Sequence, residues 1–308
     1  MKIFNRNINF KLTKNVVILI LLIILGTFSK IFITNSLYLK KIENQKQKDL
    51  QESKKIENMD YEINKIIYVN PENAFEEIKN SGYINKFSQK DMEVRKCDNK
   101  KLCEKLYQNN LIHFSYNDKR ELQKLIKLCN EKLIKYKNLY NVPWKLCKTT
   151  RKLEEGMPHT HTDIIFLSDS FFRSNEKSKI ITLIHEKLHI YQRIRKEKTT
   201  KLYNNFNFSK TPKKNINLRR TNPDLDSFDY NYNGVLIYSE FQDDAKSLSD
   251  VDTKLISIEK NKNKEIREIQ NLAKNGYQNE HPNEIFASII SEQIVNDNID
   301  KIFLNYIN

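Results

Sequence analysis

The chain is poor in residues that break regular structure and in several signals of common function classes. Among its 308 residues there are 5 glycines and 6 prolines. None of them interrupts residues 175–198, so a long helix can form there. No stripe of arginine with interleaved aromatic residues accompanies the net charge of +14. Dispersed lysine is typical of a solvated surface, so we expect no specific nucleic-acid partner.

Cysteine is also scarce, and its spacing excludes a common type of metal site. The 4 cysteines are Cys97, Cys103, Cys129 and Cys147. They contain no paired Cys-x-x-Cys knuckles, which argues against a structural zinc site. Disulfides would form if this part of the chain faced an oxidising compartment. Buried free thiols are the interpretation that we favour.

One pentapeptide stands out among the residues that are present: His185-Glu186-Lys187-Leu188-His189. Residues four apart lie on the same face of a helix, so both imidazoles can reach one metal ion while the glutamate stays free as a base. Apolar residues recur around this motif at helical spacing, and Asn175 or Ser174 can cap the helix. The sequence therefore predicts a catalytic zinc site on an amphipathic helix, with a pair of solvated histidines as the alternative.

The N-terminal part predicts a membrane anchor. Residues 16–34 are apolar with one charge near the far end, and this length can span a bilayer. A cleaved signal peptide is the alternative, but no clear cleavage site follows. We expect a single-pass membrane protein whose catalytic domain lies on the non-cytoplasmic side. The expected parts are a basic tail (1–15), a transmembrane signal anchor (16–34), a polar stalk (35–60), a mainly helical region (61–142) and a catalytic domain (143–308).

Two predicted strands, residues 144–150 and 160–168, precede the motif helix. A loop that contains Glu154 joins them. His159 and His161 are two residues apart, so they project to the same side of a regular strand. They are candidates for direct ligation of the metal or for lining the substrate cleft, and a polar strand end at the surface is the alternative. Residues 198–232 are expected to form loops beside the cleft, with a turn at Asn222-Pro223-Asp224.

A catalytic zinc commonly takes three protein ligands, so a third ligand must follow the two histidines. Gln192 and Arg195 occupy the positions where a metzincin has its glycine and third histidine, which excludes that pattern. Glu284 is the best candidate, because Pro282 suits a first helical turn and a close-packing helix follows. Glu240 is the runner-up. The other acidic candidates are Asp224, Asp226, Asp229, Asp243 and Asp244.

Far downstream of the His-Glu-x-x-His motif, the chain contains Asn283-Glu284-Ile285-Phe286-Ala287. Together the two motifs resemble the gluzincin metallopeptidases, in particular the catalytic domain of the anthrax lethal factor type. The resemblance covers about residues 143–296 and is confined to motifs. It implies an α+β zincin-like fold, with a small sheet, an active-site helix and a ligand helix. It also implies that Tyr277, seven residues before Glu284, helps to stabilise the oxyanion. Ser288 departs from the pattern, because an acidic residue is often found there.

These features together predict a membrane-anchored, zinc-dependent endopeptidase that acts on a protein or peptide. His185, His189 and Glu284 would hold Zn²⁺, and Glu186 would take a proton from the zinc-bound water. Tyr277 or one of the two strand histidines would donate to the oxyanion. The strand around residues 164–167 would pair with an extended substrate as an edge strand. The alternative function is a membrane-tethered, catalytically inactive protease-like protein with a binding or structural role.

Overall fold

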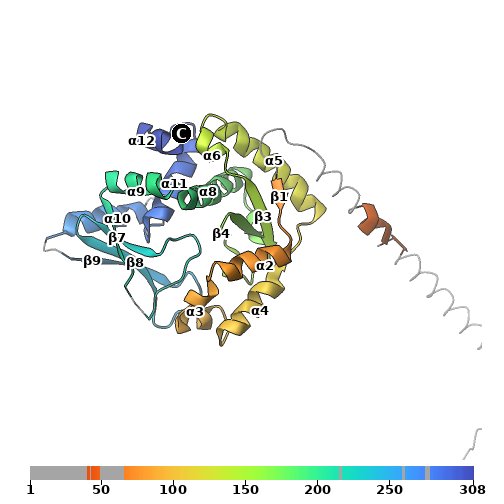
Figure 1. The fold of residues 1–308 in the computed structure, drawn as a ribbon, viewed down its shortest axis with the longest axis horizontal. Helices are drawn as coiled ribbons and strands as arrows, with labels where there is room; N and C mark the ends of the chain where they lie inside the picture. The colour runs from red at the N-terminus through yellow and green to blue at the C-terminus, as the bar shows by residue number, and fades with distance from the viewer. Residues whose placement is uncertain (1–39, 42, 49–65, 215–216, 259–260, 275–277) are drawn as a thin grey trace, which may run out of the picture. The chain divides into compact units, whose positions relative to one another are not determined.

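The computed structural model describes residues 40–41, 43–48, 66–214, 217–258, 261–274 and 278–308 (Figure 1). The chain divides into two compact units, Met1–Met59 and Asp60–Asn308. In the first unit, residues 40–41 and 43–48 are helical and exposed, as expected for a solvated stalk. No helix in the described part of the chain is long and apolar enough to cross a bilayer. The predicted anchor at residues 16–34 lies outside the described residues.

The second unit is mixed α+β and contains two sheets, which confirms the predicted fold class at this level. Its first half contains β1 (Ile66–Tyr68), α2 (Pro71–Asn80), η1 (Ile84–Lys86), α3 (Gln89–Val94), α4 (Lys100–Asn110), β2 (Leu111–Ile112), α5 (Tyr116–Leu133), α6 (Lys137–Tyr140), β3 (Trp144–Thr149), η2 (Glu154–Gly156), β4 (His159–His161), β5 (Ile164–Ser168) and α7 (Asp169–Phe172). Its second half contains α8 (Glu176–Ile194), α9 (Lys196–Asn205), β6 (Phe208–Pro212), β7 (Phe228–Tyr232), β8 (Val235–Phe241), β9 (Val251–Ser257), α10 (Asn263–Lys274), α11 (Pro282–Val295) and α12 (Lys301–Ile307).

The first sheet has the strand order β1-β3-β5-β4, and β2 also pairs with β3. β1 and β5 run parallel to β3, whereas β2 is antiparallel to β3 and β4 is antiparallel to β5. Because β1 and β2 come from the region expected to be mainly helical, the sheet extends across the expected boundary at residue 142. The two sides of that boundary share one core.

The predicted strand at residues 160–168 is in fact two strands joined by a tight turn. Thr162 adopts a positive φ of 52°, and His161 pairs with Ile164 across the turn. The expectation that residues 164–167 form a free edge is wrong, because β5 is paired on both sides, with β3 and with β4. β4 is the last strand at this end of the sheet.

The motif helix α8 forms where the sequence predicts it. The Asn175 side chain accepts a hydrogen bond from the Ser178 backbone N–H and so caps the first turn. Leu183, Ile184 and Leu188 are fully buried, because α8 packs against α5, α11 and the strands β4 and β5. Figure 1 shows α8 in the middle of this unit. The helix ends at Ile194, a few residues before the expected end, and α9 follows directly.

The second sheet is antiparallel in the order β6-β7-β8-β9. The connection between β6 and β7 returns to the first sheet, because the Asp224 carboxylate accepts a hydrogen bond from the Thr160 backbone N–H at 2.8 Å. The predicted turn is present, since the Asp224 backbone N–H donates to Asn222 Oδ1 at 2.9 Å. Residues 198–232 also include most of α9 and all of β6 and β7, so this segment is less loop-like than expected.

The cysteines correct one prediction. Cys97 and Cys103 form a disulfide across the start of α4, whereas Cys129 and Cys147 are buried free thiols. Burial raises the pKa of each free thiol to about 12, so both are unreactive. Cys129 and Cys147 therefore agree with the interpretation of buried free thiols. Cys97 and Cys103 do not, because the turn before α4 brings their Cα atoms to 5.2 Å, within the range of a disulfide.

Candidate metal centre

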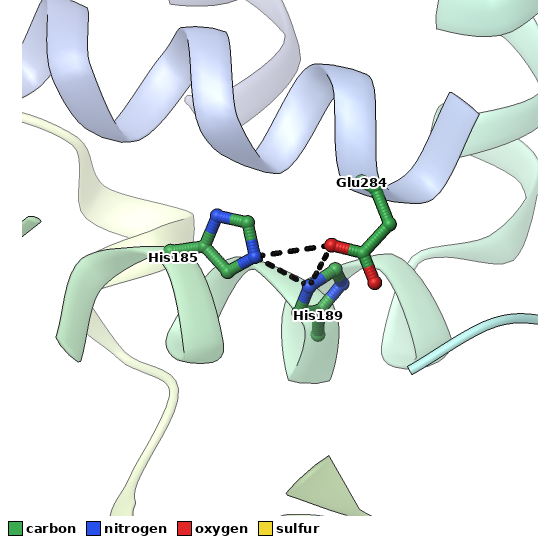
Figure 2. Close-up of side chains that lie close together, drawn as sticks. All are labelled: His185, His189 and Glu284. Carbon is green, nitrogen blue, oxygen red and sulfur yellow. Dashed lines mark hydrogen bonds and ion pairs between the residues drawn. The ribbon is translucent and has the colours of Figure 1, made fainter. Parts of the chain in front are cut away.

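Helices α8 and α11 bring three predicted ligands together (Figure 2). Glu284 Oε2 lies 3.3 Å from His185 Nε2 and 3.4 Å from His189 Nε2. The two Nε2 atoms are 2.9 Å apart. A close approach of the helices makes this possible, because the small residues Ala287 and Ser291 of α11 are fully buried. These three side chains form a group that could hold a metal ion.

The spacing of these three atoms fits a small metal ion. For ligand bonds of about 2.1 Å, two corners of a coordination tetrahedron lie about 3.4 Å apart. Both distances from Glu284 to the histidines match this edge. The shorter distance between the imidazoles corresponds to an angle of about 90° at the metal. The donor atoms therefore fit without a movement of either helix.

The electrostatics of the site favour a cation. Burial raises the pKa of the Glu284 carboxyl, but His189 and His185 outweigh burial and hold this pKa well below its usual range. Burial lowers the pKa of His189, whereas Glu284 and Asp224 raise it more strongly, to about 9. A metal ion at this position would replace the proton between the same groups.

Neighbouring side chains orient the ligands. His189 Nδ1 donates to Gln192 Oε1 at 3.0 Å, because an amide oxygen can only accept, and this leaves Nε2 to face Glu284. Gln192 in turn donates to the Asn283 carbonyl at 2.9 Å, which links α8 to α11. Asn222 Nδ2 donates to Glu284 Oε1 at 3.2 Å. Such partners hold the tautomer and the direction of each ligand.

Glu186 lies on the same cavity as the metal ligands. The cavity has a volume of about 260 Å³, and His185, Glu186 and Glu284 all line it. Burial raises the pKa of the Glu186 carboxyl well above its usual range, and the Asp224 carboxylate raises it further. Within the described part of the chain, Glu186 Oε2 has no hydrogen-bond partner. A buried carboxylate with a free oxygen at a cavity can exchange a proton with a bound molecule.

His159 and His161 project to the same side of β4, with ring centroids 5.2 Å apart. Only His159 lines the cavity of Glu186, and His161 lines a larger neighbouring pocket. His159 Nδ1 donates to the Met157 carbonyl at 2.9 Å, and within the described residues its buried Nε2 has no hydrogen-bond partner. Neither histidine belongs to a group of possible metal ligands among the described residues. The structure therefore places them as cleft residues.

The remaining predicted residues have different outcomes. Glu240 lies on β8, paired with Asp252 of β9, and it does not join the histidines. The runner-up ligand is therefore wrong, because sheet pairing fixes it away from α8. Tyr277 lies outside the described residues.

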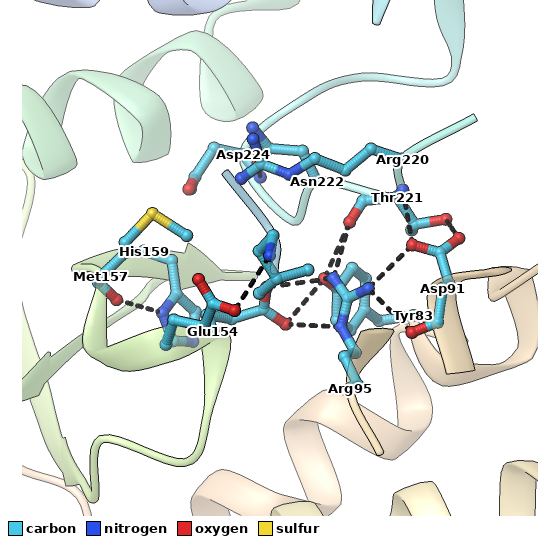
Figure 3. Close-up of polar contacts among 12 residues, drawn as sticks. Tyr83, Asp91, Arg95, Glu154, Met157, His159, Arg220, Thr221, Asn222 and Asp224 are labelled. Atoms are coloured by element: carbon cyan, nitrogen blue, oxygen red, sulfur yellow. Dashed lines mark hydrogen bonds and ion pairs between the residues drawn. The ribbon is translucent and has the colours of Figure 1, made fainter. Parts of the chain in front are cut away.

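Residues 220–224 complete the cavity in a way that the sequence patterns do not predict (Figure 3). Arg220, Asn222 and Asp224 line it together with Glu154. Asp224, one of the acidic candidates for the third ligand, forms with Glu186 and His189 a second group that could hold a metal ion. Its carboxylate also accepts hydrogen bonds from Thr160 and Arg193. The Arg-Arg pair before the Asn-Pro-Asp turn was the available signal.

A buried ionic network holds this segment against the first half of the unit. Arg95 donates to Glu154 Oε2 at 3.0 Å, to Asp91 at 2.8 Å and to the Thr221 carbonyl at 2.9 Å. The Thr221 backbone N–H donates back to Asp91 at 3.0 Å. Because Thr221 directly precedes Asn222, the network positions the residues that cover the metal site (Figure 3).

No protein-family model, curated protein or solved structure matches this chain.

Proposed function

We propose that the protein is a zinc-dependent endopeptidase with a zincin-like catalytic domain. The observation that carries the proposal is the convergence of His185, His189 and Glu284 at tetrahedral spacing, with Glu186 on the same cavity. Two imidazoles and one carboxylate, with a fourth position open to the cavity, are the donor set of many catalytic zinc sites. The order of these residues along the chain adds the gluzincin resemblance as support.

The residues around the site divide the chemistry of peptide hydrolysis among them. A bound Zn²⁺ would polarise the scissile carbonyl and acidify water in the cavity. Glu186 accepts a proton from the attacking water and returns it to the leaving amine, a role favoured by its burial and raised pKa. His159 lines the same cavity, and its Nε2 is available to form a hydrogen bond with a bound substrate. Tyr277 remains the proposed oxyanion donor.

We propose further that the protein is membrane-anchored through residues 16–34, with the catalytic domain outside the cytoplasm. The Cys97–Cys103 disulfide supports this placement, because disulfides persist in oxidising compartments and are rare in the cytosol. An added peptide strand is not part of the proposal, because β5 is paired on both sides and the Thr160 backbone of β4 is already bonded to Asp224 and Arg193.

The test combines metal content with hydrolysis for the full-length chain purified in detergent. We expect one zinc per chain, lost in His185→Ala and Glu284→Ala and kept in the matched control Glu240→Ala. Glu186→Gln should keep its zinc and lose a factor of about 100 to 10,000 in peptide cleavage.

Two outcomes would contradict the proposal. If zinc is absent from the wild type, or unchanged in Glu284→Ala, the metal site is wrong. If zinc is bound and no peptide in a mixed library is cut, the protein is the non-catalytic, protease-like binding protein instead.

A further inference from the structure

The metal cavity opens beside a larger pocket of about 1100 Å³, here called the basic groove. Asn222 and Pro223 line both spaces, so they form the wall that the cavity and the groove share. His161 and Arg193 also line the groove, next to β4 and α8. A molecule bound in the groove would therefore lie next to one bound in the metal cavity.

The charge of the groove is predominantly positive. Its cationic side chains are Lys86, Lys90, Arg193, Lys213, Lys214 and Arg219, and its carboxylates are Glu93, Asp226 and Asp243. Three of the cations are neutralised by ion pairs, Lys90 with Glu93, Arg193 with Asp224 and Arg219 with Asp229. Among the described residues, Lys86, Lys213 and Lys214 have no carboxylate within 4.0 Å of their ammonium groups. Three cations therefore remain available to a bound molecule.

Arg220 is the cationic side chain that lines the metal cavity, whose lining also contains the carboxyl groups of Glu154, Glu186, Asp224 and Glu284. Arg220 Nη1 forms an ion pair with Glu280 Oε1 at 3.9 Å, a distance too long for a hydrogen bond. Its Nε is buried and has no hydrogen-bond partner in the described part of the chain. Figure 3 shows the Arg220 side chain beside Asn222 and Asp224, across from Glu154 and His159. A buried guanidinium donor without a partner is costly, and an anionic group of a ligand would remove that cost.

We propose that the substrate is an acidic peptide, with one carboxylate side chain beside the scissile bond bound by Arg220 and further acidic residues bound in the basic groove. The inference rests on the proposed function and names the substrate class of that site. A carboxylate matches the forked donors of a guanidinium, and dispersed ammonium groups suit several acidic side chains of an extended chain.

The groove fits a peptide better than a nucleic acid. Single-stranded nucleic acids bind on exposed aromatic platforms, whereas the groove aromatics Tyr83 and Phe87 are each 4% exposed. Lys86 and Lys213 are exposed and can follow a flexible chain of either kind. The metal cavity beside the groove has a volume of about 260 Å³, which is enough for a side chain and a peptide bond.

The test measures binding as well as cleavage, so that the two proposals fail separately. Full-length Glu186→Gln protein, loaded with zinc, is titrated with pairs of fluorescent peptides. The two peptides of a pair differ at one position, where one has Glu and the other has Gln. The positions tested surround a mapped cleavage site or, if none is mapped, the centre of a library peptide. We expect the Glu peptide to bind about tenfold to a hundredfold more tightly at one position. Arg220→Gln, combined with Glu186→Gln, should abolish this ratio, and Arg220→Lys should keep part of it. The matched control is Arg173→Gln, at the exposed residue that follows α7, and it should leave the ratio unchanged.

The groove is tested with peptides that carry a distal run of acidic residues. Lys86→Gln combined with Lys213→Gln should weaken their binding and reduce its salt dependence. The control is Lys201→Gln, an exposed lysine of α9 outside the groove.

Several results would overturn the inference while leaving the proposed function intact. Equal binding of all Glu and Gln peptides means that the site is not selective for acidic residues. An equal loss of cleavage for both peptides of a pair in Arg220→Gln means that Arg220 serves the reaction and not specificity. Tighter binding of a single-stranded oligonucleotide than of any acidic peptide means that the groove is a nucleic-acid site.

Discussion

The buried carboxylate of Glu154 makes the stability of the protein depend on pH in a way that can be calculated. Glu154 is 3% exposed and accepts hydrogen bonds from Arg95 and Tyr83, each at 3.0 Å, and from Tyr107. Burial alone would raise the pKa of Glu154, but Arg95 and His159 outweigh it and hold this pKa at about 2. Substitution by Gln keeps the shape and removes the charge.

The sign and the size of the effect follow from this pKa. Because the folded pKa lies below the unfolded value, ionised Glu154 stabilises the fold above a pH of about 4.5, and the contribution is lost as the pH falls through about 2. The difference between 4.5 and about 2 corresponds to about 3 kcal/mol. At neutral pH, Glu154→Gln should lower the free energy of unfolding by about 3 to 5 kcal/mol, because it leaves Arg95 partly uncompensated.

Urea unfolding over a series of pH values measures this contribution. The only tryptophan of the chain, Trp144, is fully buried in β3, so its fluorescence reports unfolding. The difference in the free energy of unfolding between wild type and Glu154→Gln should decrease by about 3 kcal/mol as the pH falls from about 5 to about 2. Glu131→Gln, at an exposed position of α5, is the matched control. If the free energies of unfolding of wild type and Glu154→Gln fell by the same amount over this pH range, the reasoning would be refuted.

Three further predictions concern the metal site, the disulfide and the core. Gln192→Ala removes the partner of His189 Nδ1, so zinc affinity measured by chelator competition should fall about 10-fold to 100-fold; unchanged affinity would argue against an orienting role. Replacing Cys97 and Cys103 by Ser should cost about 2 kcal/mol in urea unfolding, and thiol titration of the unreduced, unfolded wild type should find only the two free cysteines. Leu188→Ala, at a fully buried position, should cost about 3 kcal/mol, and a cost below about 1 kcal/mol would contradict its place in the core.

Local patterns predicted the parts of the site that lie within one element. The helical spacing around His185 and His189, the cap at Asn175 and the start of α11 at Pro282 depend on residues within a few positions of one another. The alternation of His159 and His161 on one side of a strand is local in the same sense. These predictions needed no knowledge of the remaining chain.

Boundaries and pairings were predicted less well. The turn at Thr162 divides one predicted strand into β4 and β5, and a single residue with positive φ leaves little trace in an apolar pattern. β1 and β2 are short strands, and they are stabilised by pairing with β3 and not by their own composition. The Cys97–Cys103 disulfide likewise depends on the turn before α4.

The sequence by itself determined which kinds of side chain form the metal centre. They are two histidines on one face of a helix, a glutamate between them and a distal glutamate at the start of another helix. Only the tertiary structure decided that Glu284 and not Glu240 joins them, and that Arg220 and Asp224 complete the cavity. The physical reason is that helical periodicity is a short-range property, whereas these contacts depend on the packing of α8 against α11. They also depend on the ionic network of Arg95, which holds Thr221 in place across more than a hundred residues of chain.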